Sequence, residues 1–381
     1  MDEQTSPVRK CRMTEDRPFA HQRRERIVGE LRRHGNVRVR DLARLLEVSE
    51  PTVRRDIAAL DARGLLTKVH GGATLPTALH PGRTPVRRNR PGTAPLTIGM
   101  VVPSLDYYWP RVVSGARAAA MALGVQLQLR GSSYDPAEDR RQIGRLIEAG
   151  QVQGLLLAPT LDGEGVGEMV DWISDLPVPT IMVERQTPHW TPTASQLEWV
   201  RSDHTLGLEM AVRHLHEHGH RRVGLVLSES SPTSAHLARG WFRACEELDL
   251  PSDFVVRRAV SLHVPGHRRI IEGILDRCRR SGVTALIVHS DPDALSVAQY
   301  LTEQGVAIPD DIALVGYDDE VAHLAQPAIT AVRPAKARVG RVAVEMMVSR
   351  LVEGRHRPGQ RVLVLPELNL RDSSVKRPES L

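Results

Sequence analysis

The fold of this chain is constrained most by an alternation of short apolar strands with helical stretches, which runs from Leu96 to about Asp372. The strands are nearly continuous apolar runs, a pattern typical of strands buried on both faces of a parallel sheet. Strand and helix alternate as right-handed βαβ units require, so the sequence predicts a doubly wound α/β fold, with enough chain for two sheets. The expected strands cover residues 97–102, 125–129, 154–158, 180–183, 223–227, 285–288, 312–315 and 362–365, and helices are expected at 110–123 and 139–149.

The rest of the chain divides into shorter segments. Residues 19–75 have the pattern of a small helical domain that ends in a hairpin, and residues 76–95 are rich in Pro, Gly and Arg, as in a cationic linker. We therefore expect a disordered tail (1–18), a winged helix-turn-helix domain (19–75), a linker (76–95), the α/β domain (96–373) and a second tail (374–381).

Charge is distributed unevenly along the chain. Residues 1–95 hold 20 basic and 11 acidic residues, a net charge of +9, and the remainder holds 31 and 35, a net charge of −4. A basic first quarter on an acidic body favours a polyanionic partner for the first part only. A solvated basic face is the alternative.

Three helices are expected in the first domain. Residues 21–34 form an amphipathic helix with a basic exposed side, and residues 38–46 form a second helix that buries Leu42, Leu45 and Leu46. In the third helix, Ser49 is the N-cap and Val53, Ile57 and Leu60 form the buried stripe.

The third helix has the features of a recognition helix. Thr52, Arg54 and Arg55 lie off its buried stripe, with Glu50 at its start, and such side chains reach phosphates and base edges in the major groove. The stretch LLTKVHGGATL predicts a two-stranded wing around Gly71 and Gly72. The alternative for the arginines is surface ion pairing with Asp56 or Glu50. The DNA-binding candidates are Ser49, Glu50, Thr52, Arg54, Arg55, Lys68 and His70.

The run VRVRDLARLLEVSEPTVRRDIAALDARGLLTKVHGGA resembles the helix-turn-helix of DeoR-type regulators. The core V-S-x-x-T-x-R-R-D, followed by L-x-x-x-G and V-H-G-G-A, carries this resemblance over about residues 19–75. The resemblance implies sequence-specific binding to double-stranded operator DNA.

Polar and aromatic residues follow several of the expected strands, at the edge where open α/β sheets bind ligands. Tyr107, Tyr108 and Trp109 follow the first strand, and aromatic faces stack on sugar rings. Glu184, Arg185 and Asp318 follow later strands and suit a hydroxyl-rich ligand. The alternatives are aromatic packing under the next helix, an ion pair of Glu184 or Arg185, and a helix cap or hinge contact of Asp318.

The α/β domain resembles the effector domain of LacI-type regulators, which is similar to type I periplasmic binding proteins. The pieces that carry the resemblance over residues 96–373 are IGMVVP, GLLLAP, HLHEHGHRRVG, RGW, SDPDAL, GVAIPDDIALVGYDD and LNLRDS. It implies two lobes joined by three crossovers, a ligand in the cleft and a homodimer. The implied contacts lie at residues 104–109 (among them Ser104, Asp106, Tyr108 and Trp109) and at Ala158, Glu184, Arg185, Ser290, Asp291 and Asp318.

The chain departs from the family at several positions. An arginine is common three residues before the glycine of RGW, where this chain has Leu237, and Glu184 and Ser290 replace a common Asp and Asn. These changes argue against a plain pyranose ligand. Residues 76–95 also lack the apolar helical spacing of a LacI-type hinge helix.

Other kinds of site are not expected. The histidines at 214, 216, 218 and 220 share a helix, but their pattern also suits a helix end, so no metal site is predicted. We found no G-x-S-x-G, P-loop or H-E-x-x-H motif, and neither a catalytic set nor a cofactor is expected.

Together these features predict a cytoplasmic, dimeric repressor of a carbohydrate uptake or catabolism operon, controlled by a small molecule such as a sugar. The first twenty residues have no apolar run and no stretch suits a transmembrane helix. A carbohydrate-binding transport component and an enzyme fused to a DNA-binding head are the alternatives.

Overall fold

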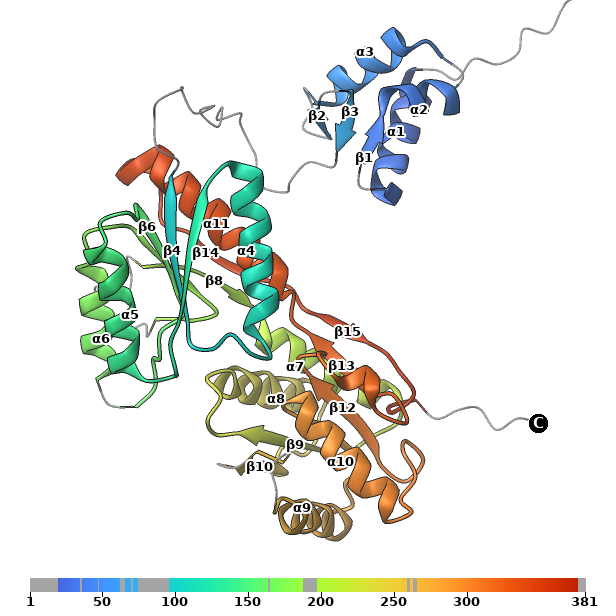
Figure 1. Ribbon diagram of the computed structural model, residues 1–381. Helices are drawn as coiled ribbons and strands as arrows, with labels where there is room; N and C mark the ends of the chain where they lie inside the picture. The colour runs from blue at the N-terminus through green and yellow to red at the C-terminus, as the bar shows by residue number, and fades with distance from the viewer. Residues whose placement is uncertain are drawn as a thin grey trace, which may run out of the picture. The chain divides into compact units, whose positions relative to one another are not determined.

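The computed structural model describes residues 20–34, 36–46, 48–61, 66–69, 71–74, 96–163, 165–187, 197–258, 261–262 and 266–375. The chain divides into two compact units, residues 1–90 and 91–381, which we describe separately (Figure 1). The tail predicted for residues 1–18 and the linker predicted for residues 76–95 lie outside the described residues. None of the described helices is long and apolar enough to cross a membrane.

The described part of the first unit packs three helices against a small antiparallel sheet. Its elements are α1 (Ala20–His34), β1 (Asn36–Arg38), α2 (Val39–Leu45), α3 (Glu50–Asp61), β2 (Thr67–Val69) and β3 (Gly72–Thr74). Strand β3 lies between β1 and β2 and pairs antiparallel with both. The structure thus contains the three expected helices and the wing hairpin. It adds β1, because a three-residue strand is too short to show a periodicity.

The core of this unit differs from the prediction at one leucine of α2. Leu42 and Leu46 are buried with Ile27, Val53 and other apolar side chains. Leu45, in contrast, is 55% exposed, so its predicted burial is wrong. Because α2 has only two turns, the two leucines spaced four apart fill its inner side and Leu45 lies beside that stripe.

Two arginines of the basic helix α1 are engaged in ion pairs within the domain. Arg23 Nε and Arg24 Nε donate to the two carboxylate oxygens of Asp56 in α3, at 3.0 and 2.9 Å. Asp56 is 3% exposed, so this carboxylate joins α1 to α3 from the inner side. Two arginines of the predicted basic face are therefore structural.

Replacing Asp56 by Asn should destabilise the first unit by about 2 kcal/mol, because the substitution leaves two partly buried guanidiniums without their counter-charge. Hydrogen exchange of the α1 and α3 amides in the full-length protein would measure the loss. Asp41→Asn, on the exposed side of α2, is the matched control and should change exchange little. Equal exchange in the two variants would show that the Asp56 contacts do not stabilise the unit.

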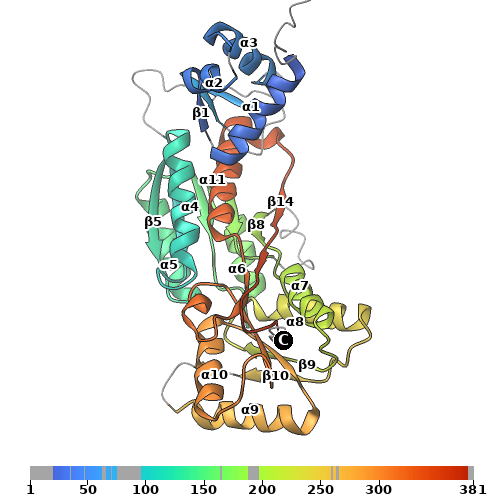
Figure 2. The ribbon, with the colours of Figure 1, turned by 90° about the vertical axis from the view of Figure 1, so that its right-hand side faces the viewer.

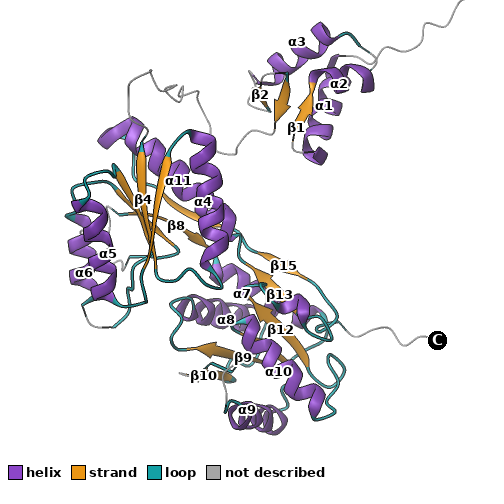
Figure 3. Ribbon diagram, viewed as in Figure 1, coloured by secondary structure: helices purple, strands orange, loops and turns teal. Residues whose placement is uncertain are grey.

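The first lobe of the second unit is built on a six-stranded parallel sheet, with strands in the order β14-β8-β7-β6-β4-β5. Figure 3 shows its strands in orange and the surrounding helices in purple. Its strands are β4 (Thr97–Val102), β5 (Gln126–Gly131), β6 (Gly154–Leu157), β7 (Thr180–Val183), β8 (Glu198–Ser202) and β14 (Arg361–Val364). Its helices are α4 (Trp109–Leu123), α5 (Pro136–Glu148), α6 (Val166–Ser174) and α11 (Lys336–Glu353). Side chains of α4 and α11 share one core cluster on one face of the sheet, and those of α5 and α6 share another.

Helices α4 and α11 lie side by side on this sheet (Figure 1 and Figure 2). A Cβ at Gly115 would lie 1.9 Å from the carbonyl oxygen of Ala337, and one at Gly340 would lie 1.9 Å from that of Val112. Each helix therefore uses a glycine where the backbone of the other touches it.

The second lobe has the sheet order β10-β9-β11-β12-β13-β15, in which only the β13–β15 pair is antiparallel. Its strands are β9 (Val223–Ser228), β10 (Val255–Arg258), β11 (Ala285–Val288), β12 (Ala313–Tyr317), β13 (Thr330–Arg333) and β15 (Glu367–Asn369). Its helices are α7 (His204–Glu217), α8 (Ser234–Glu247), α9 (Arg268–Ser281) and α10 (Asp291–Glu303), with a short 3₁₀ turn η2 (Ala322–Leu324). A second 3₁₀ turn, η3 (Gly354–His356), follows α11 of the first lobe. Side chains of α7 and α8 share one core cluster, and those of α9 and α10 share another.

The chain passes between the lobes three times: from β8 to α7, from β13 to α11, and from β14 to β15. The predicted two-lobed, doubly wound fold is thus confirmed, and all eight expected strands are present within two residues of their predicted ends. Strands β8, β10, β13 and β15 were not predicted, because sequences such as EWVRS and ELN have no continuous apolar run. Ser374, assigned to the C-terminal tail, is buried and bonds to His214 Nε2 at 2.8 Å.

Candidate functional site

The start of α3 carries most of the DNA-binding candidates. The carbonyl oxygen of Ser49 accepts from the backbone N–H groups of Thr52 and Val53, at 3.0 and 3.2 Å, and its hydroxyl bonds to the Thr52 hydroxyl at 2.9 Å. Val53 is fully buried, which turns Arg54 and Arg55 outward. The structure therefore brings Ser49, Glu50, Thr52, Arg54 and Arg55 together at one exposed helix end.

The two exposed arginines of α3 differ in their ion pairing. Arg54 forms an i,i+4 ion pair with Glu50 at 3.0 Å, with side chains 64% and 43% exposed. Such an exposed pair contributes little stability and exchanges readily for a phosphate. Arg55 has no ion pair among the described residues. Lys68 is exposed on β2 of the wing, and His70 lies outside the described residues.

In the second unit, one tyrosine of the first lobe reaches two carboxylates of the second. The Tyr107 hydroxyl donates to Asp291 Oδ1 and lies 3.2 Å from Asp318 Oδ2. Tyr107 follows β4, and the two aspartates follow β11 and β12, so these contacts join strand ends of both lobes. Tyr107 was predicted only as part of the aromatic triplet.

Glu184 is a buried hub at the end of β7. Its Oε1 accepts from the hydroxyls of Tyr108 and Ser202, both at 2.8 Å, and its Oε2 accepts from the Ser202 N–H at 3.1 Å. His204 Nε2 lies 3.4 Å from the same Oε2. Because its acceptor positions are occupied, Glu184 orients its neighbours rather than offering a free oxygen.

These contacts set the ionisation of Glu184. Burial would raise the pKa of this carboxyl, but the contacts from His204, Ser202 and Tyr108 outweigh burial and lower the pKa from 4.5 to about 2. Glu184 is therefore an anion at every physiological pH.

Glu184→Gln should lose a pH-dependent part of the stability. Because the folded-state pKa is depressed, this stabilisation is complete above pH 4.5 and is lost as the pH falls toward 2. The difference in unfolding free energy between wild type and E184Q should therefore shrink by about 2 kcal/mol between pH 5 and pH 3. Urea unfolding followed by tryptophan fluorescence measures it, since all five tryptophans lie beyond residue 96.

The control for this prediction is Glu148→Gln, on the exposed end of α5. Its difference from wild type should stay constant between pH 5 and pH 3. A constant difference for E184Q as well would contradict the role of Glu184 as an ionised hub.

The carboxylates of Asp291 and Asp318 are buried. Asp291 Oδ2 accepts from the N–H groups of Val321 and Ala322, at 2.6 and 2.9 Å, which leaves Oδ1 for Tyr107. Asp318 is 4% exposed, and its Oδ2 lies 4.0 Å from His289 Nε2. Burial raises the pKa of both carboxyl groups. Ser290 lies at the same place, directly before Asp291.

Other predicted ligand contacts are placed differently. Trp109 is 2% exposed in the core of the first lobe, where its Nε1 donates to the Tyr134 hydroxyl at 3.2 Å; Ala158 is in the same core. Arg185 is buried, and its guanidinium donates to the carbonyl oxygens of Pro159 and Glu184 at 2.7 and 2.8 Å. Ser104 accepts from the Asp106 N–H at 2.9 Å in an exposed turn.

Several polar residues of this region were not predicted. His204 Nδ1 bonds to the Tyr317 hydroxyl at 3.1 Å, and burial lowers the pKa of His289 to about 3. Lys336 Nζ donates to the Asp318 carbonyl oxygen, pairs with Glu320 at 2.8 Å and lies 4.9 Å from the centre of the Tyr108 ring. Strand β8 would have pointed to Ser202 and His204, had it been recognised.

The histidines of the α7 end are used within the fold. His214 bonds to Ser374, His218 Nδ1 bonds to the carbonyl oxygen of His214 at 2.8 Å, and His220 Nδ1 bonds to the Thr284 hydroxyl at 2.9 Å. These contacts agree with the interpretation of the pattern as a helix end.

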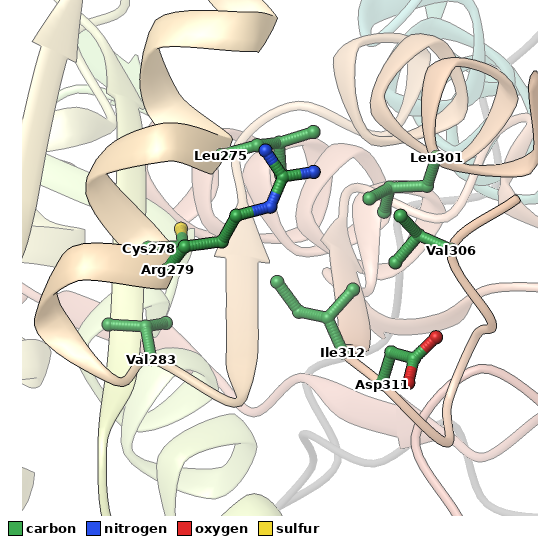
Figure 4. Close-up of a pocket in the computed structure, with 8 residues that line it drawn as sticks. All are labelled: Leu275, Cys278, Arg279, Val283, Leu301, Val306, Asp311 and Ile312. Carbon is green, nitrogen blue, oxygen red and sulfur yellow. The ribbon is translucent and has the colours of Figure 1, made fainter. Parts of the chain in front are cut away.

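A separate pocket lies at the other end of the second lobe (Figure 4). It encloses about 220 Å³ near the starts of β11 and β12, lined by Leu275, Cys278, Arg279, Val283, Leu301, Val306, Asp311 and Ile312. Ligand pockets for drug-sized molecules span about 300–1,000 Å³. The small volume and apolar lining make this pocket a poorer site for a sugar than the strand ends around Tyr107.

Comparison with protein families confirms both predicted domains. A DeoR-like helix-turn-helix domain matches residues 23–78, and a periplasmic binding protein-like domain matches residues 212–374.

Relatives are known along most of the chain. The arabinose metabolism transcriptional repressor of Geobacillus stearothermophilus is 25% identical over 344 residues, which cover 88% of this chain and 90% of that protein. The HTH-type transcriptional repressor PurR of Vibrio atlanticus is 27% identical, with 84% and 93% covered. The ribose operon repressor of Escherichia coli is 25% identical, with 68% and 76% covered.

Solved structures share the fold. A LacI-family regulatory protein from Chloroflexus aggregans superposes with a TM-score of 0.63 at 24% identity, covering 73% of this chain and 98% of that one. The transcriptional regulator CelR in complex with cellobiose superposes with a TM-score of 0.61 at 23% identity, covering 94% and 100%.

Proposed function

We propose that this transcription regulator, in which a DeoR-like helix-turn-helix domain precedes a LacI-type effector domain, represses a carbohydrate operon and is controlled by a small hydroxylated molecule bound between its lobes. The observation that carries the proposal is the Tyr107 contact with Asp291 and Asp318. It places hydrogen-bonding groups of both lobes at the carboxyl ends of their strands, where α/β folds bind ligands.

In this proposal the effector replaces the Tyr107 hydroxyl. A ligand hydroxyl can donate to Asp291 Oδ1 or to Asp318, as the phenol does now. The hub at Glu184 holds Tyr108, Ser202 and His204 around the same space. A ligand that binds one arrangement of the lobes better shifts the population toward it, and a coupling of about 1–3 kcal/mol changes operator affinity by about 5–150-fold.

On the DNA side, Ser49, Thr52, Arg54 and Arg55 of α3 would enter the major groove, with Lys68 and His70 of the wing on the backbone. We propose a homodimer, because two recognition helices read two half-sites of an operator. The protein would act in the cytoplasm as a binding protein without catalysis.

Two measurements on the full-length protein test the proposal. Selection from a random duplex library should yield a specific operator, and a thermal-shift screen of sugars, polyols, sugar phosphates and nucleosides should yield a stabilising compound. An effector at 100 times its Kd should add about 2.7 kcal/mol of stability and change operator affinity. A protein that binds a sugar but selects no DNA sequence would fit a transport component instead, and turnover of the sugar would indicate an enzyme.

A further inference from the structure

A buried arginine at the end of β8 forms no ion pair with the described residues. Arg201 is 6% exposed; its guanidinium donates one bond, to the Ser202 carbonyl oxygen at 3.0 Å, and lies 5.3 Å from the centre of the Trp199 ring. Its Nε has no hydrogen-bond partner, and no carboxylate of the described residues lies within ion-pair distance of it. Leaving a buried charge uncompensated is costly, so such a group is expected to meet an anion.

The nearest carboxylates are already engaged. The oxygens of Glu184 accept from Tyr108, Ser202 and His204. Asp203 Oδ1 caps α7 by accepting from the Leu206 N–H at 3.1 Å. Glu184 cannot turn to Arg201 without losing its bonds. The cap occupies only Oδ1 of Asp203, but this carboxylate does not form an ion pair with Arg201 either.

Helix α8 of the second lobe carries an imidazole and a guanidinium near Arg201. His236 and Arg239 are three residues apart and share a helix face. Gly240 lets this face touch α7, because a Cβ there would lie 2.3 Å from the Thr205 carbonyl oxygen. The Thr205 hydroxyl donates to the His236 carbonyl oxygen at 3.3 Å, which fixes α8 on the first turn of α7.

The three groups are close enough to affect one another. Burial lowers the pKa of His236 to about 3, with further lowering by Arg201, His204 and Arg239. Burial also lowers the pKa of Arg201; Arg239 lowers it further, whereas Asp203 and Glu184 raise it. His236 Nδ1 has no hydrogen-bond partner, and the exposed Arg239 has no ion pair among the described residues. Two guanidiniums and a neutral imidazole therefore lie near one another, and neither guanidinium forms an ion pair with a carboxylate of the described residues.

We propose that Arg201, His236 and Arg239 form an anion-binding subsite that takes a phosphate or carboxylate group of the effector. Arg201 comes from the first lobe and the other two residues from the second, so a bound anion joins the lobes. Guanidinium groups suit planar, bidentate recognition of either anion. At position 237, where related regulators commonly have an arginine, this chain has a leucine that is buried in the core. Arg201 and Arg239 supply positive charge in this region instead.

The inference rests on the proposed function and narrows its ligand class. Asp291 and Asp318, which face Tyr107, repel an anion and accept hydroxyl groups. The effector is therefore a polyhydroxylated anion, with hydroxyls toward the two aspartates and its charged group toward Arg201. A sugar phosphate and a sugar acid share this chemistry.

The test uses the full-length protein, with inorganic phosphate and acetate as separate probes that replace chloride at constant ionic strength. At least one anion should raise Tm in a saturable way, by about 2–4 °C at ten times its Kd. Arg201→Gln and Arg239→Gln should each remove most of this rise. Arg280→Gln, an exposed arginine of α9, and the Arg54→Ala/Arg55→Ala double variant of α3 should keep it.

A response to phosphate alone assigns the subsite to a phosphate group, and a stronger response to acetate assigns it to a carboxylate. The inference is overturned if neither anion gives a saturable rise, or if the rise persists in both R201Q and R239Q. Because Arg239 is exposed, R239Q stays informative even if R201Q fails to fold. Operator selection with the same preparations tests the proposed function separately, so specific DNA binding without an anion response overturns only the subsite.

Discussion

Replacing both Arg54 and Arg55 by Ala is expected to weaken operator binding by at least about 100-fold and to leave Tm nearly unchanged. Each arginine contact to a base or phosphate is worth about 1–3 kcal/mol, and the proposed homodimer would lose each contact twice. Both side chains are exposed, and the pair of Arg54 with Glu50 stabilises the helix little. Fluorescence anisotropy with the selected operator measures the affinity.

The single variants separate the two arginines. Arg55 has no ion pair among the described residues, so Arg55→Ala should cost more than Arg54→Ala, whose guanidinium must first leave Glu50. If an arginine contacts a phosphate, its removal should reduce the steepness of the plot of log K against log salt concentration by about 0.9. If it contacts a base, its removal should instead change the sequence preference.

The matched control for the double variant is Arg279→Ala/Arg280→Ala on α9. It removes the same charge from a helix in which Arg279 pairs with Asp276 at 2.8 Å, as Arg54 pairs with Glu50. This control should bind the operator as wild type does. If R54A/R55A also binds normally, α3 is not the recognition helix.

The sequence predicted where the candidate site residues lie better than it predicted which contacts each of them makes. The candidate ligand residues were predicted to follow apolar strands, and Tyr108, Glu184 and Asp318 do lie just after β4, β7 and β12. Whether an oxygen is free depends on contacts between distant segments. The carboxylate oxygens of Glu184 are occupied by Tyr108, Ser202 and His204. Ser202 ends β8 and His204 begins α7, and β8 has no continuous apolar run by which the sequence could have predicted it.

Side-chain direction was also beyond sequence reasoning at these positions. Tyr107, Glu184 and Asp318 have positive φ values of 54°, 52° and 93°. Alternation along a strand predicts which face a side chain takes only for extended backbone, and it fails where φ is positive. Such conformations are uncommon for residues other than glycine and cluster at functional sites. In the first unit, the Asp56 contacts escaped prediction because residues more than thirty positions apart make them.

Asp318→Asn is expected to lower affinity for the effector about 10–100-fold without lowering Tm at pH 7. A hydrogen bond to a charged group contributes about 1.5–3 kcal/mol, and the amide retains only a neutral acceptor for it. Burial raises the pKa of Asp318 in the folded protein, so its stability contribution is lost as pH rises and its charge costs stability at neutral pH. Asparagine keeps the shape, removes that charge and tolerates a positive φ. Tm should therefore stay equal or rise.

The neighbouring aspartate provides the contrast that separates a binding role from a structural one. Asp319 is equally buried, but its carboxylate pairs with Arg371 at 2.7 Å and accepts from Asn369 Nδ2 at 2.6 Å, which ties β15 and the residue pair after it to the end of β12. Asp319→Asn should therefore lower Tm by several degrees and change effector affinity much less than D318N does. Tryptophan fluorescence gives both Tm values, and release of the operator by the most stabilising compound of the screen gives both affinities. If D318N kept the effector response, or if both variants lost stability alike, Asp318 would belong to the framework of the lobe, and the ligand would have to bind through other residues around Tyr107.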